Sequence, residues 1–222
     1  MKSSIILCLL LVISFSGRSQ HQETFTENGF TLVFINEDPE FNPQVKDSLV
    51  KTFFQVYPQI THDFNSESLR TLEVKIDTAY NGVAYAHNGK ITISSEWLRK
   101  KPEDIDVITH EVMHIVQSYP HKSGPGWLTE GIADYVRHVY GVDNKRAGWS
   151  LTGYSADNHY TQSYRITARF LLWITQKYDK TLVLKLDKHL REKTYHEELW
   201  EKYTGKSLED LWKEYQSAPQ LS

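Results

Sequence analysis

Two histidines four positions apart, His110 and His114 in the segment "THEVMHIVQ", constrain this chain more than any other feature of its sequence. On an α-helix, positions four apart differ by about 40° in direction and about 6 Å in rise, so both imidazoles point to one side. Glu111 lies about 100° around the helix from His110. The spacing predicts a helix that presents two imidazoles to a metal ion, with a carboxylate beside the ion. The alternative is a histidine pair on an ordinary helix face, since such a short pattern also arises by chance.

A second pair of polar residues with the same spacing follows in "WLTEGIADYV", where Glu130 and Asp134 are four positions apart. Glu130 would complete a set of two histidines and one glutamate, which leaves the fourth position of a zinc ion to water, as in catalytic zinc sites. Asp134, one turn further, could accept the second N–H of a ligating imidazole and fix its orientation. The alternative for this pair is a solvated helix face, but the apolar neighbours of Asp134 favour the metal site.

The chain begins with an apolar run, Ile5 to Phe15, that follows Lys2 and precedes the small residues Gly17 and Ser19. This layout predicts a cleavable secretory signal over residues 1–19, too short to cross a membrane as a stable helix. We therefore expect a secreted or periplasmic protein without stable membrane association after signal cleavage. The only cysteine, Cys8, lies within this segment, so a metal site in the remaining chain must use His, Asp or Glu.

The 222 residues carry a formal net charge of -3, and removal of the signal makes the chain more acidic still. An acidic protein is a poor partner for a phosphate backbone, so we expect no nucleic acid ligand. The length suits roughly one domain with a sizeable core. The sequence makes no prediction of an oligomeric state.

Hydrophobic periodicity predicts an α+β fold. Residues 20–29 are polar and are expected to form a loose leader, after which "FTLVFIN" and "TLEVKID" alternate as strands do, with a helix between them that Asn42 caps and Pro43 begins. Two Asn-Gly pairs, at 81–82 and 88–89, predict tight turns around "VAYAH" and "KITIS".

The pattern changes to a helical period from Glu103 onward. The first helix carries the histidine pair, and the second runs from about Trp127 to Tyr140. We therefore expect a sheet with the active-site helices over residues 30–141, an all-helical lobe over 142–216 and a tail over 217–222, with the zinc cleft between the two parts.

These motifs resemble those of known zinc peptidases. His-Glu-x-x-His followed by Glu-x-x-x-Asp resembles the thermolysin-type metallopeptidases called gluzincins. Five longer segments, which together fall within about residues 30–215, resemble the basic secretory protein family of plants and bacteria: "TAYNGVAYAHNGKITISSEWL", "THEVMHIVQSYP", "PGWLTEGIADYVRHVYG", "SYRITARFLLWI" and "YTGKSLEDLW". The resemblance implies a gluzincin-like, zinc-dependent peptidase that acts on a peptide or protein substrate. It also implies that His110, His114 and Glu130 bind zinc and that Glu111 is catalytic. The family name refers to basic proteins, whereas this chain is mildly acidic.

Peptide hydrolysis also needs a donor for the developing oxyanion, and similar enzymes take a Tyr or His from the later helical part. Tyr164 is our candidate, with Tyr154, His159 and Tyr160 just upstream, although a packing role for Tyr164 is equally consistent with its position. The strand in "GVAYAHN" could pair with an extended substrate, or it could be an ordinary strand of the sheet.

Two alternatives remain open at the level of function. An endopeptidase is favoured over an aminopeptidase, because the sequence has no amine-binding segment like Gly-x-Met-Glu-Asn. A different class is a secreted binding or defence protein in which the metal is structural or vestigial. Such a site would be closed by a fourth protein ligand, for which His87, His121 and His159 are the candidates.

Overall fold

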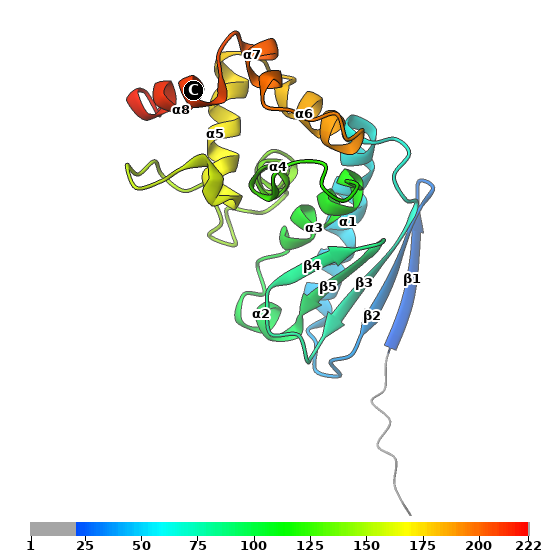
Figure 1. The fold of residues 1–222 in the computed structure, drawn as a ribbon. Coiled ribbons are helices and arrows are strands. Elements are labelled where there is room, and N and C mark those ends of the chain that lie inside the picture. Colours follow the sequence, from blue (N-terminus) through cyan, green and yellow to red (C-terminus); the bar gives the residue numbers. More distant parts are fainter. Residues whose placement is uncertain (1–20, 222) are drawn as a thin grey trace, which may run out of the picture.

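The computed structural model describes residues 21–221, which form a five-stranded sheet and a set of helices (Figure 1). The α+β class predicted from the sequence is confirmed. The expected signal over residues 1–19 lies outside the described residues. Within the described part, no helix is long and apolar enough to cross a membrane.

The sheet is mixed, with strand order β1-β2-β3-β5-β4. The two pairs at its edges, β1 with β2 and β4 with β5, are antiparallel, whereas β2, β3 and β5 run parallel. The strands are β1 (His21–Glu27), β2 (Phe30–Asn36), β3 (Thr71–Asp77), β4 (Ala84–His87) and β5 (Lys90–Ser94). As expected, the turn at Asn88 and Gly89 joins β4 to β5, and both residues have positive φ. Because β4 stands last in the strand order, it is an edge strand.

The loose leader expected over residues 20–29 is wrong, because His21–Glu27 forms strand β1 at the other edge of the sheet. Its polar composition reflects an edge position, where only alternate side chains contact the protein. Glu23 forms an ion pair with Lys46, with 2.7 Å between oxygen and nitrogen, and Phe25 packs against the core. The sequence carried a signal for this hairpin: Asn28 and Gly29 both have positive φ, as a two-residue hairpin turn requires.

Helices cover one face of the sheet, and the other face carries mostly polar side chains. Leu72, Val74 and Ile76 of β3 are fully buried beneath α1 (Pro43–Phe64) and α3 (Val107–Gln117), while Lys75 on the opposite face forms an ion pair with Asp77. As predicted, Asn42 caps α1, since its side chain accepts a hydrogen bond from the backbone N–H of Gln44 (2.9 Å). The alternation in β3 thus sets which face of the sheet becomes the core.

Helix α3 begins at Val107, later than the start predicted at Glu103. The reason lies in two buried aspartates that bind other groups. Asp104 accepts hydrogen bonds from Arg137 and from Trp97 Nε1, where Trp97 belongs to the short helix α2 (Ser95–Lys100). Asp106 accepts the backbone N–H groups of Val142 and Asp143 at 2.9 and 2.6 Å, which fixes the loop after the next helix to the start of α3. These contacts hold residues 102–106 in turns.

Helix α4 (Gly126–Tyr140) lies close to α5 (Tyr164–Lys177) because a glycine stands at their contact. A methyl group added at Gly131 would lie 2.2 Å from Cγ2 and 2.6 Å from Cβ of Thr167, far inside van der Waals contact. Thr167 is fully buried and its hydroxyl donates a hydrogen bond to the carbonyl of Tyr160. Gly131 therefore sets how near the two helices approach.

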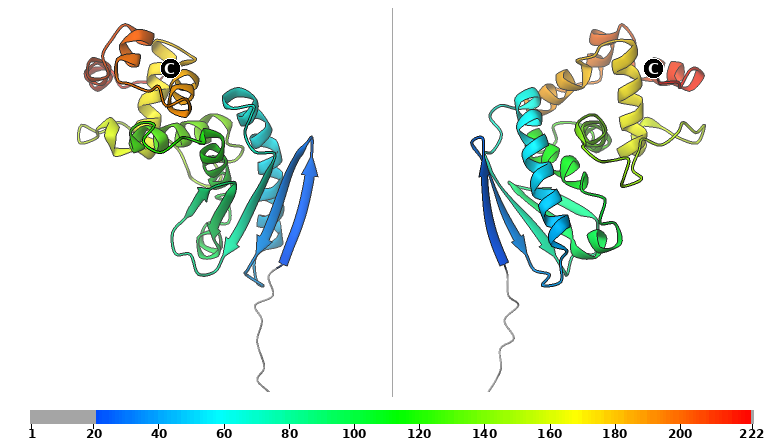
Figure 2. Two further views of the ribbon diagram at one scale, coloured as in Figure 1. Left: turned by 45° about the vertical axis from the view of Figure 1, so that its right-hand side comes forward. Right: turned by 180° about the vertical axis from the view of Figure 1, so that it is seen from behind.

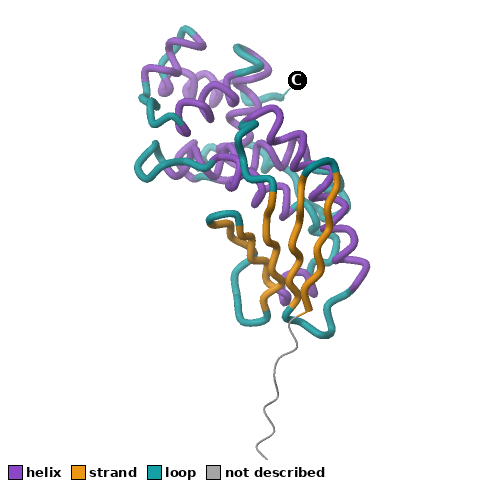
Figure 3. Tube along the Cα trace, turned by 90° about the vertical axis from the view of Figure 1, so that its right-hand side faces the viewer, coloured by secondary structure: helices purple, strands orange, loops and turns teal. Residues whose placement is uncertain are grey.

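The remaining helices form the C-terminal part of the molecule, away from the sheet (Figures 2 and 3). Figure 3 shows the strands grouped at one end and these helices at the other. Their core is aromatic: Phe170 of α5 contacts Trp200 and Trp212, with ring centroids 6.4 and 5.0 Å apart. The elements are the short 3₁₀ helix η1 (Tyr160–Gln162), α6 (Leu182–Arg191), α7 (Glu198–Thr204) and α8 (Leu208–Ser217). The helical character predicted after residue 158 is borne out.

Candidate metal centre

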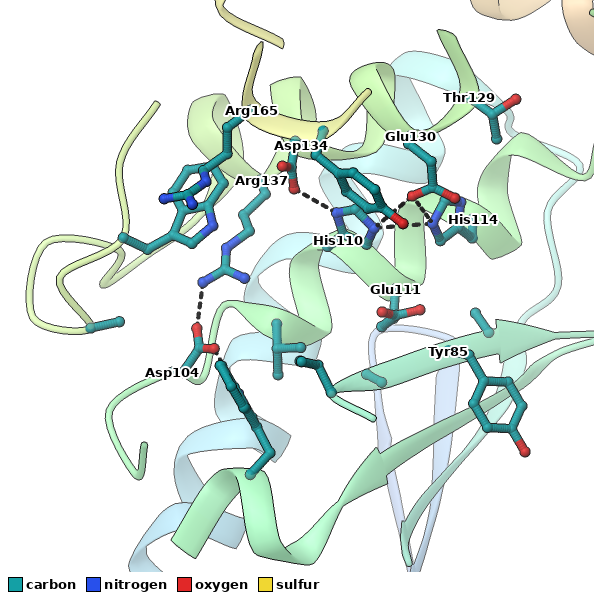
Figure 4. Close-up of a pocket in the computed structure, with 18 of the residues that line it drawn as sticks. Tyr85, Asp104, His110, Glu111, His114, Thr129, Glu130, Asp134, Arg137 and Arg165 are labelled. Carbon is teal, nitrogen blue, oxygen red and sulfur yellow. Dashed lines mark hydrogen bonds and ion pairs between the residues drawn. The ribbon is translucent and has the colours of Figure 1, made fainter. Parts of the chain in front are cut away.

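Three potential metal ligands converge from two helices. His110 and His114 lie on α3, and Glu130 lies on the first half of α4. The two Nε2 atoms are 3.1 Å apart, and each lies 3.4 Å from the same oxygen of Glu130, Oε2 (Figure 4). The helical spacing of four therefore brings both imidazoles to one point, and the packing of α4 against α3 brings the carboxylate to it.

These distances suit a tetrahedral zinc ion. With zinc–nitrogen and zinc–oxygen bonds of about 2.0–2.2 Å, two ligand atoms of such a site lie roughly 3.3 Å apart. The edges of the triangle formed by the three side chains are 3.1, 3.4 and 3.4 Å. Two imidazoles and a carboxylate are also ligands that zinc accepts in catalytic sites. The donor set and its spacing thus fit the metal without rearrangement of the helices.

Each imidazole is held by a hydrogen bond on its other nitrogen. His110 Nδ1 lies 2.7 Å from Asp134 Oδ1, and His114 Nδ1 lies 2.8 Å from Gln117 Oε1. Because both acceptors are oxygens, the Nδ1 atoms donate, which leaves each Nε2 free to bind a metal. The two supports differ in charge, since Asp134 is a carboxylate and Gln117 a neutral amide. Gln117 in turn donates from Nε2 to the carbonyl of Thr129 at 2.9 Å, which ties α3 to α4.

The centre favours positive charge. Burial opposes protonation of His110, but the nearby carboxylates of Asp134 and Glu130 outweigh it and raise the pKa of the imidazole well above its usual value. Burial would also raise the pKa of Glu130, yet its contacts with His110 and His114 hold that pKa below its usual range. A cation placed among these groups is therefore stabilised by at least two carboxylates.

Glu111 stands beside the three ligands and does not belong to their set (Figure 4). Its side chain is 5 % exposed, and its Oε2 atom has no hydrogen-bond partner among the described residues. Burial raises the pKa of Glu111, although the histidines act in the opposite direction. An unpaired buried carboxylate oxygen is costly, so its presence points to a group that the site receives during function.

A cavity of about 1030 Å³ surrounds the centre. Its floor is formed by α3 and α4, and residues 83–86 around edge strand β4 form one wall. Figure 4 shows that the cavity continues on both sides of the ligands: Tyr85 and Thr129 lie on one side, and Asp104, Arg137 and Arg165 on the other. An extended chain bound along β4 would therefore pass the centre with room at both ends.

Tyr164, the candidate donor, lines the same cavity at the first residue of α5. Its ring stacks over that of His110 with 6.2 Å between centroids, and its side chain remains half exposed. The charge of Glu130, with burial and other nearby carboxylates, raises the pKa of its hydroxyl, so the group keeps its proton. Ser163 and Tyr164 have φ of 65° and 51°, a left-handed conformation that is strained in residues with a side chain.

The alternative candidates lie elsewhere. His159 bonds to Thr161 and packs on Tyr160, whose hydroxyl donates to Glu209 Oε1 of α8. His87, His121 and His159 do not join the ligand group, so the described chain supplies three protein ligands to this centre and no fourth. Sequence reasoning missed Gln117, although its place three residues after His114 on the same helix face was a signal for it.

A sequence-family comparison gives one match. A family model described as "Peptidase of plants and bacteria" matches residues 13–215. A search of curated proteins finds no match.

Solved structures with a similar fold include three peptidases. Aminopeptidase A of Legionella pneumophila in complex with aspartic acid has a TM-score of 0.60 and 16 % identity, and the match covers 87 % of this chain and 28 % of that chain. An aminopeptidase N family protein of Idiomarina loihiensis has a TM-score of 0.53 and 11 % identity, with 88 % of this chain and 46 % of that chain covered. An M1 zinc metallopeptidase of Deinococcus radiodurans has a TM-score of 0.52 and 10 % identity, with 83 % of this chain and 48 % of that chain covered. The present chain thus spans between a quarter and a half of their lengths. At these identities the likeness concerns the fold.

Proposed function

Because the chain belongs to this family of peptidases of plants and bacteria, we propose that it hydrolyses peptide bonds with a zinc ion held by His110, His114 and Glu130. The proposal rests on one observation above all: the buried carboxylate of Glu111 stands next to the three converging ligands with an oxygen that no other described group binds. A site that only held a metal would have no use for such a group.

The residues of the chain divide the chemistry among them. Zinc, when bound, supplies a Lewis acid that polarises a carbonyl and lowers the pKa of water toward about 7. Glu111 would accept a proton from water at the centre, which its raised pKa favours, and would then pass that proton to the leaving amine. Tyr164 keeps its proton and donates a hydrogen bond to the oxygen on which negative charge develops. Asp134 and Gln117 keep the two imidazoles oriented.

The substrate is an extended peptide that pairs with edge strand β4. Among the described strands β4 pairs with β5 alone, so a row of its peptide groups is open to a further strand. The cavity continues past the centre in both directions, which supports cleavage within a chain, so we propose an endopeptidase. The apolar segment before residue 20 supports action outside the cytoplasm, which N-terminal sequencing of protein from the medium or periplasm would test.

Replacement of Glu111 by Gln tests the proposal. The change keeps the size of the side chain and leaves the three ligands intact, so zinc content and thermal stability should be nearly unchanged. Loss of general-base catalysis should lower cleavage of a denatured protein or peptide library by about 100- to 10,000-fold. Equal rates for wild type and variant at equal zinc occupancy would contradict the role of Glu111. Absence of cleavage by zinc-loaded wild-type protein would favour the binding-protein alternative.

A further inference from the structure

One end of the cavity is rich in cations that the proposed reaction does not use. Three basic residues line it, from three different helical regions: Lys101 at the end of α2, Arg137 on α4 and Arg165 on α5. Figure 4 places Arg137 and Arg165 on the same side of the centre, together with Asp104. Since the whole chain is acidic, this concentration of positive charge is local.

Asp104, the acid that lies beside these cations on the side away from the metal ligands, is already neutralised. Asp104 is 6 % exposed, and each of its oxygens has a partner: Arg137 Nη2 binds Oδ1, and Trp97 Nε1 binds Oδ2 at 2.9 Å. Lys101 and Arg165 form no ion pair within residues 21–221, and the only bond of the Arg165 guanidinium there is a long one, 3.5 Å, to the carbonyl of Ser150. Lys101 and Arg165 therefore contribute two positive charges that no ion pair among the described residues offsets.

Arg137 itself has binding capacity left. It is 5 % exposed, and its guanidinium is fixed from three directions: Nη2 to Asp104, Nε to Asn144 Oδ1 at 3.0 Å, and its face over the ring of Trp149 at 4.4 Å. Its third nitrogen, Nη1, binds no other group in the described part of the chain. A buried, immobile guanidinium with a free N–H is suited to bind a carboxylate, because its geometry is set before the ligand arrives.

Apolar groups line the cavity near these cations. The ring of Trp149 lies under the Arg137 guanidinium, Trp97 donates to Asp104, and Val107 stands one turn before His110. An acidic side chain could pack its methylene groups against such apolar groups while its carboxylate binds the guanidinium groups. A lysine or arginine side chain at the same place would meet three like charges.

We propose that this end of the cavity is a specificity pocket for an acidic side chain, Glu or Asp, of the peptide substrate next to the cleaved bond. The inference rests on the proposed peptidase function and deepens it by naming a class of substrate. Charge-assisted hydrogen bonds to partly buried groups correspond to preferences of about 10- to 100-fold. The kcat/KM for a peptide with Glu at the position bound here should exceed that for its Gln counterpart by that factor.

The test uses paired peptides and a matched pair of variants. Peptides that carry Glu or Gln at each position around the cleaved bond are compared with wild-type, zinc-loaded protein. The double variant Lys101→Gln/Arg165→Gln should lower the Glu-to-Gln ratio of kcat/KM by about 10-fold or more. The control, Lys100→Gln/Arg146→Gln, removes the same charge from residues that do not line the cavity and should leave the ratio as in wild type.

The outcomes separate this inference from the proposed function. Cleavage without a preference for Glu at any position overturns the pocket and leaves the peptidase standing. If wild type cleaves nothing, binding of the same peptides to the zinc-loaded Glu111→Gln variant still decides: tighter binding of a Glu peptide, lost in Lys101→Gln/Arg165→Gln, supports the pocket. Equal or absent binding of both peptides overturns it.

Discussion

Replacement of Gly131 by Ala would test how the contact between α4 and α5 positions the metal centre. The added methyl group would lie 2.2 Å from Thr167 Cγ2, so relief to an ordinary contact of 3.4 Å requires a shift of about 1 Å. Thr167 is branched at Cβ, fully buried and hydrogen-bonded to Tyr160, so a rotation of its side chain does not provide that shift. The two helices must move apart.

The expected cost follows from two opposing effects. Overpacking in a core costs about 1–3 kcal/mol. Alanine is a better helix former than glycine by about 1 kcal/mol, which offsets part of that cost. The free energy of unfolding should therefore fall by up to about 2 kcal/mol, which corresponds to a drop in Tm of up to about 8 °C for a chain of this size. Because Gly131 is adjacent to Glu130, zinc affinity should fall as well.

The assays are thermal unfolding and zinc competition with a chromogenic chelator. Gly126→Ala is a matched control on the same helix, since a methyl group there meets nothing within 4 Å. It should leave both quantities nearly unchanged. Addition of Thr167→Ala to Gly131→Ala removes the nearest atom, Cγ2, and should recover part of the zinc affinity. If Gly131→Ala behaves like Gly126→Ala in both assays, the helix contact does not position the ligand.

Three further predictions concern the centre and the surface. Asp134→Asn keeps a hydrogen-bond acceptor for His110 but removes the negative charge of the side chain, so zinc affinity or activity should fall about 10- to 100-fold while the fold is retained. An unchanged zinc affinity in competition assays would mean that Asp134 does not support the metal. His114→Ala should abolish zinc binding, so elemental analysis should find little zinc and a chelator should lower the Tm of wild type but not of the variant. Lys177 and other partners lower the pKa of Glu214 to about 2, so this carboxylate stabilises the fold above its unfolded pKa of about 4.5, and the stabilisation is lost as the pH falls toward 2. The difference in unfolding free energy between wild type and Glu214→Gln should therefore be present at pH 7 and absent near pH 2. A difference that does not change with pH would contradict the assignment.

Local spacing made much of the candidate centre predictable. His110 with His114, and Glu130 with Asp134, are pairs four apart on two helices, so helical geometry alone places the members of each pair on one side of their helix. The contact between the two helices also involves residues close in sequence, because only a short Gly- and Pro-containing segment separates α3 from α4. The sequence therefore indicated both the chemistry of the centre and the helices that carry it.

Features that depend on tertiary contacts could not be predicted from the sequence. The start of α3 depends on where Asp104 and Asp106 find partners, and Arg137 and the loop at 142–143 are distant in the chain. The cations of the specificity pocket come from three helical regions, and no spacing rule relates Lys101 to Arg165. Strand β1, in contrast, could have been predicted from the sequence, because the Asn-Gly pair at 28–29 indicates a hairpin turn and only the polar composition of the strand argued against it.

The open edge at β4 has a consequence for the protein at high concentration. The peptide groups proposed to pair with a substrate strand would equally pair with the same strand of another copy, which is a route to aggregation. The opposite edge, β1, carries charged side chains, whereas β4 reads Ala-Tyr-Ala-His. The short length of β4, four residues, limits such pairing, and an occupied cleft prevents it. Substrate-like peptides should therefore also act as solubility agents, because they would cover the open edge beside the metal centre.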